Sequence, residues 1–164
     1  MITFKYIVGV LIICVLAYLF YDERKKRMLE KRNMSFMESI HLTGVPIVTF
    51  VNNDHIVNLI LDTGSNTNLI DSGILKNLEY KTSDVKNSVI GIGGTTVESN
   101  YVLIPLEHGH KHFDVPCIST DMSETIAAIK ETYGVTIHGL VGTGFFSKYK
   151  YILDFSSMTA YSKE

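Results

Sequence analysis

An aspartate that directly follows an apolar run is the feature that most constrains the fold of this chain. Residues 56–61 are apolar except for one asparagine, and they predict a buried strand that ends at Asp62. A buried carboxylate is unfavourable unless it is hydrogen-bonded, paired or protonated. Gly64 lacks a Cβ and permits a tight turn in which backbone N–H groups approach the carboxylate. Thr63 and Ser65 add hydroxyl groups that can donate to it, so the segment predicts a carboxylate held within a turn.

Two glycine-bearing segments lie further along the chain. Residues 89–97 contain two β-prone runs joined by a glycine-rich tip, which predicts a hairpin with a mobile tip. Residues 139–142 read Gly-Leu-Val-Gly and precede two nearby phenylalanines, which is typical of a buried strand at a crowded crossing. Taken singly, each segment can be an ordinary turn, loop or strand. Their order, spacing and strand context together favour one functional site.

The three segments together resemble the retroviral-type, retropepsin-like aspartic proteases, and the resemblance extends over residues 45–160. In this family the Asp-Thr-Gly turn carries the catalytic carboxylate, the glycine-rich hairpin closes over the substrate, and the second glycine motif lies beside the turn. The resemblance implies catalytic roles for Asp62, Thr63 and Gly64. The substrate-binding residues that it implies are Ser65, Ile90, Gly91, Ile92, Gly93, Gly94 and Val141.

The implied fold is all-β: an acid-protease barrel with one helix, which we expect at residues 123–133. The chain contains a single Asp-Thr-Gly, and the part that follows the first 40 residues is one domain in size. Because the chemistry of the family needs two carboxylates on one water, such a chain supplies half a site and must form a twofold dimer. Many relatives carry Asp or Asn where this chain has Gly144, so the hydrogen bonding of that turn stays open.

The N-terminal segment is apolar. Residues 2–21 are interrupted only by Lys5, and about 20 apolar residues suffice to cross a bilayer as a helix. A cleaved signal peptide is the alternative, but the apolar run is long and no small-x-small cleavage site precedes Asp22. We therefore expect a transmembrane helix that remains part of the protein.

The expected organisation is a transmembrane helix over residues 1–21, a basic juxtamembrane linker over residues 22–40 and a protease domain over residues 41–164. Cytoplasmic flanks of membrane helices carry an excess of Lys and Arg, so the linker predicts a single-pass protein with its protease domain in the cytoplasm. The basic residues that carry this prediction are Arg24, Lys25, Lys26, Arg27, Lys31 and Arg32.

Charge and cysteine content exclude other classes of function. The net charge is −2 and no basic stripe occurs in the domain, so nucleic acid is not an expected partner. Cys14 lies in the apolar segment and Cys117 is alone in the domain, which leaves no intradomain disulfide and fits a reducing compartment. We expect Cys117 to be a small buried hydrophobic residue.

Alternating histidines raise the question of a metal site. His108, His110 and His112 would share one face of a strand, a spacing compatible with metal binding, but Gly109 and its polar neighbours favour an exposed turn. We therefore expect neither a metal nor another cofactor. Asp154 is predicted to be a surface residue at the end of a strand rather than a second catalytic acid.

These observations predict a membrane-anchored, homodimeric aspartic endopeptidase that hydrolyses polypeptides with a water activated by the two Asp62 carboxylates. Two alternatives stay open. The same fold can serve as a non-catalytic peptide-binding module, or as a membrane-tethered assembly protein whose purpose is the dimer. The intact Asp-Thr-Gly and hairpin glycines argue against the first, because a binding module needs no pair of carboxylates.

Overall fold

The computed structural model describes residues 12–21, 33–90 and 96–163, and for residues 83–90 and 96–100 it describes the backbone alone. The chain divides into two compact units, Met1–Arg32 and Asn33–Glu164. Residues 12–21 of the first unit are helical, and the other residues of the predicted transmembrane helix lie outside the described part. No helix among the described residues is both long enough and apolar enough to cross a membrane.

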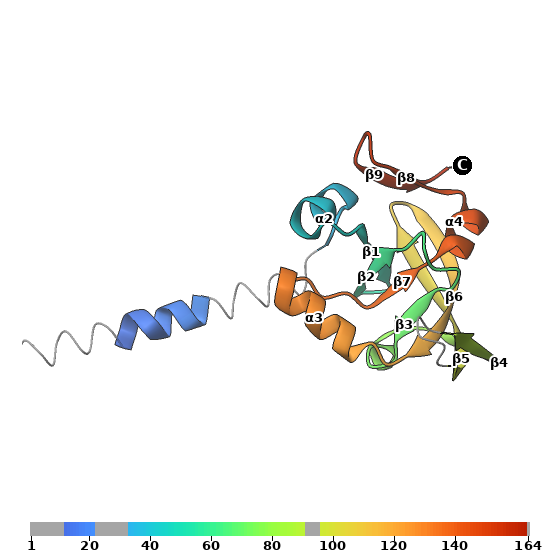
Figure 1. Ribbon diagram of the computed structural model, residues 1–164, viewed down its shortest axis with the longest axis horizontal. Helices are drawn as coiled ribbons and strands as arrows, with labels where there is room; N and C mark the ends of the chain where they lie inside the picture. The colour runs from blue at the N-terminus through green and yellow to red at the C-terminus, as the bar shows by residue number, and fades with distance from the viewer. Residues whose placement is uncertain (1–11, 22–32, 91–95, 164) are drawn as a thin grey trace, which may run out of the picture. The chain divides into compact units, whose positions relative to one another are not determined.

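The second unit is built around a seven-stranded sheet (Figure 1). The strands follow the order β1-β2-β7-β3-β6-β5-β4, and β1 also pairs with β5 at Val51 and Glu107. Six strands therefore close into a barrel, and β4 extends from it. The strands are β1 (Ile47–Asn52), β2 (His55–Leu61), β3 (Leu69–Asp71), β4 (Lys81–Ile90), β5 (Thr96–His108), β6 (Lys111–Thr120) and β7 (Gly139–Val141).

Strand β5 is long and changes partner along its length. From Tyr101 onward it pairs with β6, and this pairing ends at His108 and Lys111. Residues 96–100 pair with β4 alone among the described strands, up to the pair Ile90 and Thr96. The ladder between β4 and β5 is irregular between Thr82 and Lys86. The β4–β5 pair is thus a two-stranded ribbon beyond the barrel, and the predicted hairpin is confirmed up to its tip.

Alternating side chains form the core of the barrel. On β6, Phe113, Val115 and Cys117 are buried while the residues between them are exposed, which is the period-two pattern of a strand with one face inward. Phe50 of β1 lies at the centre of an aromatic cluster, with its ring 5.8 Å from that of Phe145. Cys117 is 1% exposed, so the prediction that it is a buried hydrophobic residue is confirmed.

The expectation of a single helix was wrong. Helix α3 (Ser123–Tyr133) occupies the predicted residues and ends at Gly134 in the left-handed region, with φ 70°. Two further α-helices are described in this unit, α2 (Phe36–Thr43) and α4 (Thr143–Tyr149), together with a short 3₁₀ helix, η1 (Leu75–Asn77). Both additional α-helices are too short to show a helical period in the sequence. Each is stabilised by one buried aromatic side chain, Phe36 or Phe145.

The chain ends in a hairpin of β8 (Tyr151–Asp154) and β9 (Thr159–Ser162), which forms a separate two-stranded sheet. Asp154 closes β8, and its carboxylate accepts hydrogen bonds from Ser156 and Ser157. These bonds lower the pKa of Asp154 to about 2. The carboxylate therefore belongs to the turn of this hairpin, in a different sheet from the strand that precedes Asp62.

Candidate active site

The Asp62 carboxylate lies in a hydrogen-bonded turn at the end of β2, as the sequence predicts. The N–H of Gly64 donates to Asp62 Oδ1 at 2.8 Å. The N–H of Asp62 itself donates to the carbonyl of Val141 on the neighbouring strand β7, at 2.9 Å. Asp62 is half-buried and Thr63 is exposed, so the turn presents its carboxylate toward solvent.

Strand β7 passes close beside this turn because two of its glycines leave room for other backbones. It pairs in parallel with β2 and antiparallel with β3. A Cβ on Gly139 would lie 2.2 Å from the carbonyl oxygen of Leu69, and one on Gly142 would lie 2.5 Å from that of Ser65. Contacts this short are not possible for a side chain, so the geometry requires glycine at both positions. The absence of side chains at these two glycines explains how the second glycine motif can lie beside the Asp62 turn.

Local turn geometry alone does not distinguish Asp62. Asp71, at the end of β3, has the same arrangement, because its Oδ2 accepts a hydrogen bond from the N–H of Gly73 at 3.1 Å. Its other oxygen accepts from the N–H of Met122 at 3.0 Å, so both oxygens of Asp71 have structural partners. Asp62 Oδ2 accepts no hydrogen bond from any described residue. Asp62 therefore keeps one carboxylate oxygen without a partner among the described residues, whereas each oxygen of Asp71 has one.

The other predicted site residues have different surroundings. The Ser65 hydroxyl donates to the carbonyl of Thr67 at 2.8 Å and accepts from its N–H at 3.1 Å, so Ser65 shapes the loop. The Val141 side chain is fully buried in the barrel core, and only its backbone reaches the turn. Ile90 is the last residue of β4. Gly91, Ile92, Gly93 and Gly94 lie outside the described residues.

One residue of the site was missed by the sequence analysis. Asn68 is 8% exposed, and its Oδ1 accepts a hydrogen bond from the N–H of Gly142 at 2.9 Å. Its Nδ2 donates to the carbonyl of Pro116 on β6, also at 2.9 Å. No strand was predicted beside Asn68, and an isolated amide residue after the turn is no signal of this role.

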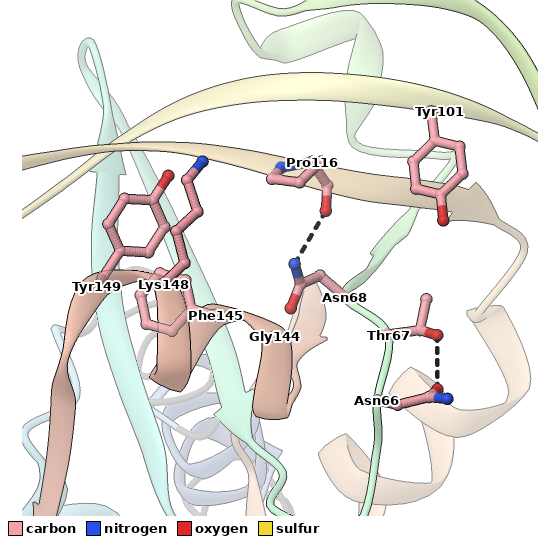
Figure 2. Close-up of a pocket in the computed structure, with 9 residues that line it drawn as sticks. All are labelled: Asn66, Thr67, Asn68, Tyr101, Pro116, Gly144, Phe145, Lys148 and Tyr149. Carbon is pink, nitrogen blue, oxygen red and sulfur yellow. Dashed lines mark hydrogen bonds between the residues drawn. The ribbon is translucent and has the colours of Figure 1, made fainter.

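A pocket of about 210 Å³ lies beside the loop that follows the Asp62 turn, and Figure 2 shows Asn68 near its centre. Asn68 points toward Pro116, and α4 forms one wall. The lining residues are Asn66, Thr67, Asn68, Tyr101, Pro116, Gly144, Phe145, Lys148 and Tyr149.

A half-buried histidine, His138, joins β2 to the residues that lead into β7. The N–H of His138 donates to the carbonyl of Asn58 at 2.8 Å, and its Nδ1 accepts from the N–H of Asn58 at 2.9 Å. Burial lowers the pKa of His138, and the nearby carboxylate of Asp71 partly opposes this effect. A neutral imidazole is the form that can accept at Nδ1, so the lowered pKa agrees with the hydrogen bond.

The three alternating histidines do not converge on one point. His108 is half-buried, with Nδ1 3.1 Å from the carbonyl oxygen of Thr49, and burial lowers its pKa. His112 lies instead beside the carboxylate of Glu107, at 3.2 Å. The turn between β5 and β6 contains Gly109 in the left-handed region, with φ 63°, as the sequence indicates. Within the described part of the chain, no three potential metal ligands gather into a site.

The family follows from comparison with known proteins. A family model described as aspartyl protease matches residues 48–145, more than half of the chain, and spans both the Asp62 turn and β7. The chain belongs to the aspartyl protease family. The sequence-based recognition of an aspartic protease is thus confirmed. The solved structure of EIAV protease complexed with the inhibitor HBY-793 is similar to this aspartyl protease, with 18% sequence identity and a TM-score of 0.47. The match covers 65% of this chain and 89% of that one. No curated protein matches the chain.

Proposed function

We propose that this aspartyl protease is an endopeptidase whose active site contains Asp62 from each of two identical chains. The observation that carries the proposal is a solvent-facing carboxylate at a strand end, fixed through one oxygen and free at the other among the described residues. Aspartic protease chemistry needs two such carboxylates on one water. The chain has one Asp-Thr-Gly, so the second carboxylate has to come from a second copy.

In the proposed mechanism, the two Asp62 carboxylates share one proton because both cannot ionise at short range. One acts as general base on the bound water, and the other donates a proton toward the carbonyl oxygen of the scissile bond. The tetrahedral intermediate forms without a covalent bond to the enzyme. The N–H of Gly64 holds Oδ1 of each carboxylate, which leaves Oδ2 for the reaction.

The remaining predicted residues have supporting roles in this proposal. Thr63 is exposed beside the carboxylate and would bond across the dimer axis. Residues 90–94, which follow β4 in the sequence, would close over an extended polypeptide, add backbone hydrogen bonds and exclude water. Ser65 would act indirectly, because its hydroxyl is bonded within the loop.

The test uses residues 33–164, which form a unit with its own hydrophobic core. The protein is incubated with a diverse peptide mixture at about pH 5 and 7, because the protonation of a carboxylate pair depends on pH. Cleavage sites are identified by mass spectrometry at several protein concentrations. We expect the rate per chain to rise with concentration until the dimer is saturated, because the site assembles from two copies.

Two outcomes would contradict the proposal. A folded dimer that cleaves no peptide would favour a peptide-binding or assembly role. A rate per chain that stays constant down to concentrations at which the protein is monomeric would mean that one chain suffices.

We further propose that the apolar N-terminal segment anchors the protein in a membrane with the protease domain in the cytoplasm. The support is the apolar run before residue 22 and the six basic residues that follow it. The full chain is expected to stay in the membrane fraction during alkaline extraction, and protease added from the cytoplasmic side should digest the domain. Release of the chain into the soluble fraction would contradict membrane anchoring. Protection of the domain from the added protease would mean that the domain lies on the opposite side of the membrane.

A further inference from the structure

We propose that Asn68 is a positioning residue that fixes the Asp62 turn against β7 and so sets the geometry of the carboxylate pair. This inference rests on the proposed function. The Asn68 side chain is more than nine-tenths buried, and both of its polar atoms have backbone partners. Its Oδ1 binds the N–H of Gly142 and its Nδ2 binds the carbonyl of Pro116 (Figure 2). Its own carbonyl accepts from the N–H of Ile118. One residue thereby joins the loop to β6 and to the end of β7.

Three consecutive residues after the start of β7 hold the loop that carries the carboxylate. The Val141 carbonyl accepts from the N–H of Asp62 at the beginning of the loop. The N–H of Thr143 donates to the carbonyl of Ser65 in the middle, at 2.8 Å. The N–H of Gly142 donates to the side chain of Asn68 at the end. The first two bonds join backbones, whereas the third depends on a side chain and can be removed by substitution.

The amide of asparagine suits this position because it carries one hydrogen-bond acceptor and one donor group. The Gly142 partner is a donor and the Pro116 partner is an acceptor, so the side chain must accept on one branch and donate on the other. Alanine can do neither, and it would leave the buried N–H of Gly142 and the carbonyl of Pro116 without this side-chain partner. An ionised aspartate can accept from Gly142 but cannot donate to Pro116.

Asn52 provides a matched control. It is 1% exposed, and its Nδ2 donates to the carbonyls of Glu79 and Pro105 while its Oδ1 accepts from the N–H of Glu79. It ends β1 opposite His55, whereas Asp62 follows the other end of the same hairpin, where Ile47 pairs with Ile60. Asn52 therefore makes the same kind of backbone bridge as Asn68 but at a distance from the carboxylate.

The experiment compares residues 33–164 with the variants Asn68→Ala, Asn68→Asp and Asn52→Ala. We expect Asn68→Ala to lower kcat by about 10- to 100-fold with little change in KM, because a small misplacement of reacting groups costs rate rather than affinity. The pH profile of kcat should also shift, since it reports the carboxylate pair. Asn68→Asp should recover part of the loss at about pH 5, because burial raises the pKa of a carboxyl at this position and the protonated form both accepts and donates. Asn52→Ala should lower the melting temperature and keep the kcat and pH profile of the parent.

Amide hydrogen exchange gives a readout that does not depend on activity. Exchange in residues 62–68 should accelerate in Asn68→Ala and stay at the parental rate in Asn52→Ala. If Asn68→Ala is unfolded at the assay temperature, Asn68→Asp supplies the same comparison. Unchanged exchange, or equal loss of kcat in the Asn68 and Asn52 variants, would overturn the positioning role. A folded parent dimer that cleaves nothing would overturn the proposed function, while the exchange data would still decide the role of Asn68.

Discussion

Replacement of Asp62 by asparagine is expected to abolish peptide cleavage, with kcat lowered by about 10⁴-fold or more. An amide cannot take a proton from the bound water, and in a homodimer the substitution removes both carboxylates at once. The turn itself should survive, because the amide oxygen can still accept the hydrogen bond that Gly64 donates to Asp62 Oδ1. Cleavage of the peptide mixture by parent and variant, read by mass spectrometry, measures the effect, and the dimer content of both is checked by sedimentation.

Asp71→Asn is the matched control for this variant. Asp71 forms the same local turn with Gly73, but both of its oxygens accept hydrogen bonds from backbone N–H groups. The control should therefore retain cleavage, provided that it remains folded. Cleavage by purified Asp62→Asn at the parental rate would show that this carboxylate is not the acid–base group. Equal loss in both variants would indicate an effect on folding.

Gly139→Ala is expected to destabilise the domain by about 3 kcal/mol or more, which is a large part of the stability of an ordinary domain. The new Cβ would lie 2.2 Å from the carbonyl oxygen of Leu69 and 3.1 Å from Cα of Ile70. Both atoms belong to the backbone of β3, so no side-chain rotation relieves the contact. Strands β3 and β7 would have to separate in the middle of the barrel. Thermal unfolding followed by circular dichroism should show a melting temperature lower by about 10 °C or more.

Gly144→Ala tests whether the effect belongs to the close contact rather than to glycine as such. A Cβ at Gly144 would lie 3.7 Å from the carbonyl oxygen of Asn66, an ordinary van der Waals distance. Gly144 lies in α4, where alanine is favoured over glycine by about 0.5–1 kcal/mol. The melting temperature of this variant should equal or exceed that of the parent. A similar loss of stability in both variants would mean that strand separation is not the cause.

The parts of the fold that depend on local sequence could be predicted. The hairpin of β1 and β2, the pairing of β5 with β6 and the turn at Asp62 follow from alternating apolar residues and from turn residues between them. The short helices α2 and α4 could not, because fewer than three turns leave no periodic signal and tertiary packing decides their conformation.

Asn68 could not be predicted for a different reason. Its two side-chain partners, Pro116 and Gly142, lie 48 and 74 residues away in the sequence. Asn68 acquires this role only when β3, β6 and β7 pack together, and no local sequence pattern predicts that packing. The carboxylate turn was recognisable because its chemistry is contained in three adjacent residues.

Because β5 changes partner along its length, closure of the barrel and bending of the β4–β5 ribbon depend on different parts of this strand. The barrel is closed by the pairing of β1 with the end of β5, at Val51 and Glu107. The ribbon of β4 with residues 96–100 lies beyond that closure, and two-stranded ribbons are only marginally stable by themselves. The ladder is irregular between Thr82 and Lys86, and we expect the ribbon to bend there without breaking the hydrogen bonds that close the barrel. In the proposed function, a polypeptide would enter and leave by bending this ribbon, at a free-energy cost that does not depend on the stability of the barrel. We therefore expect mutations in the ribbon to alter entry without altering stability.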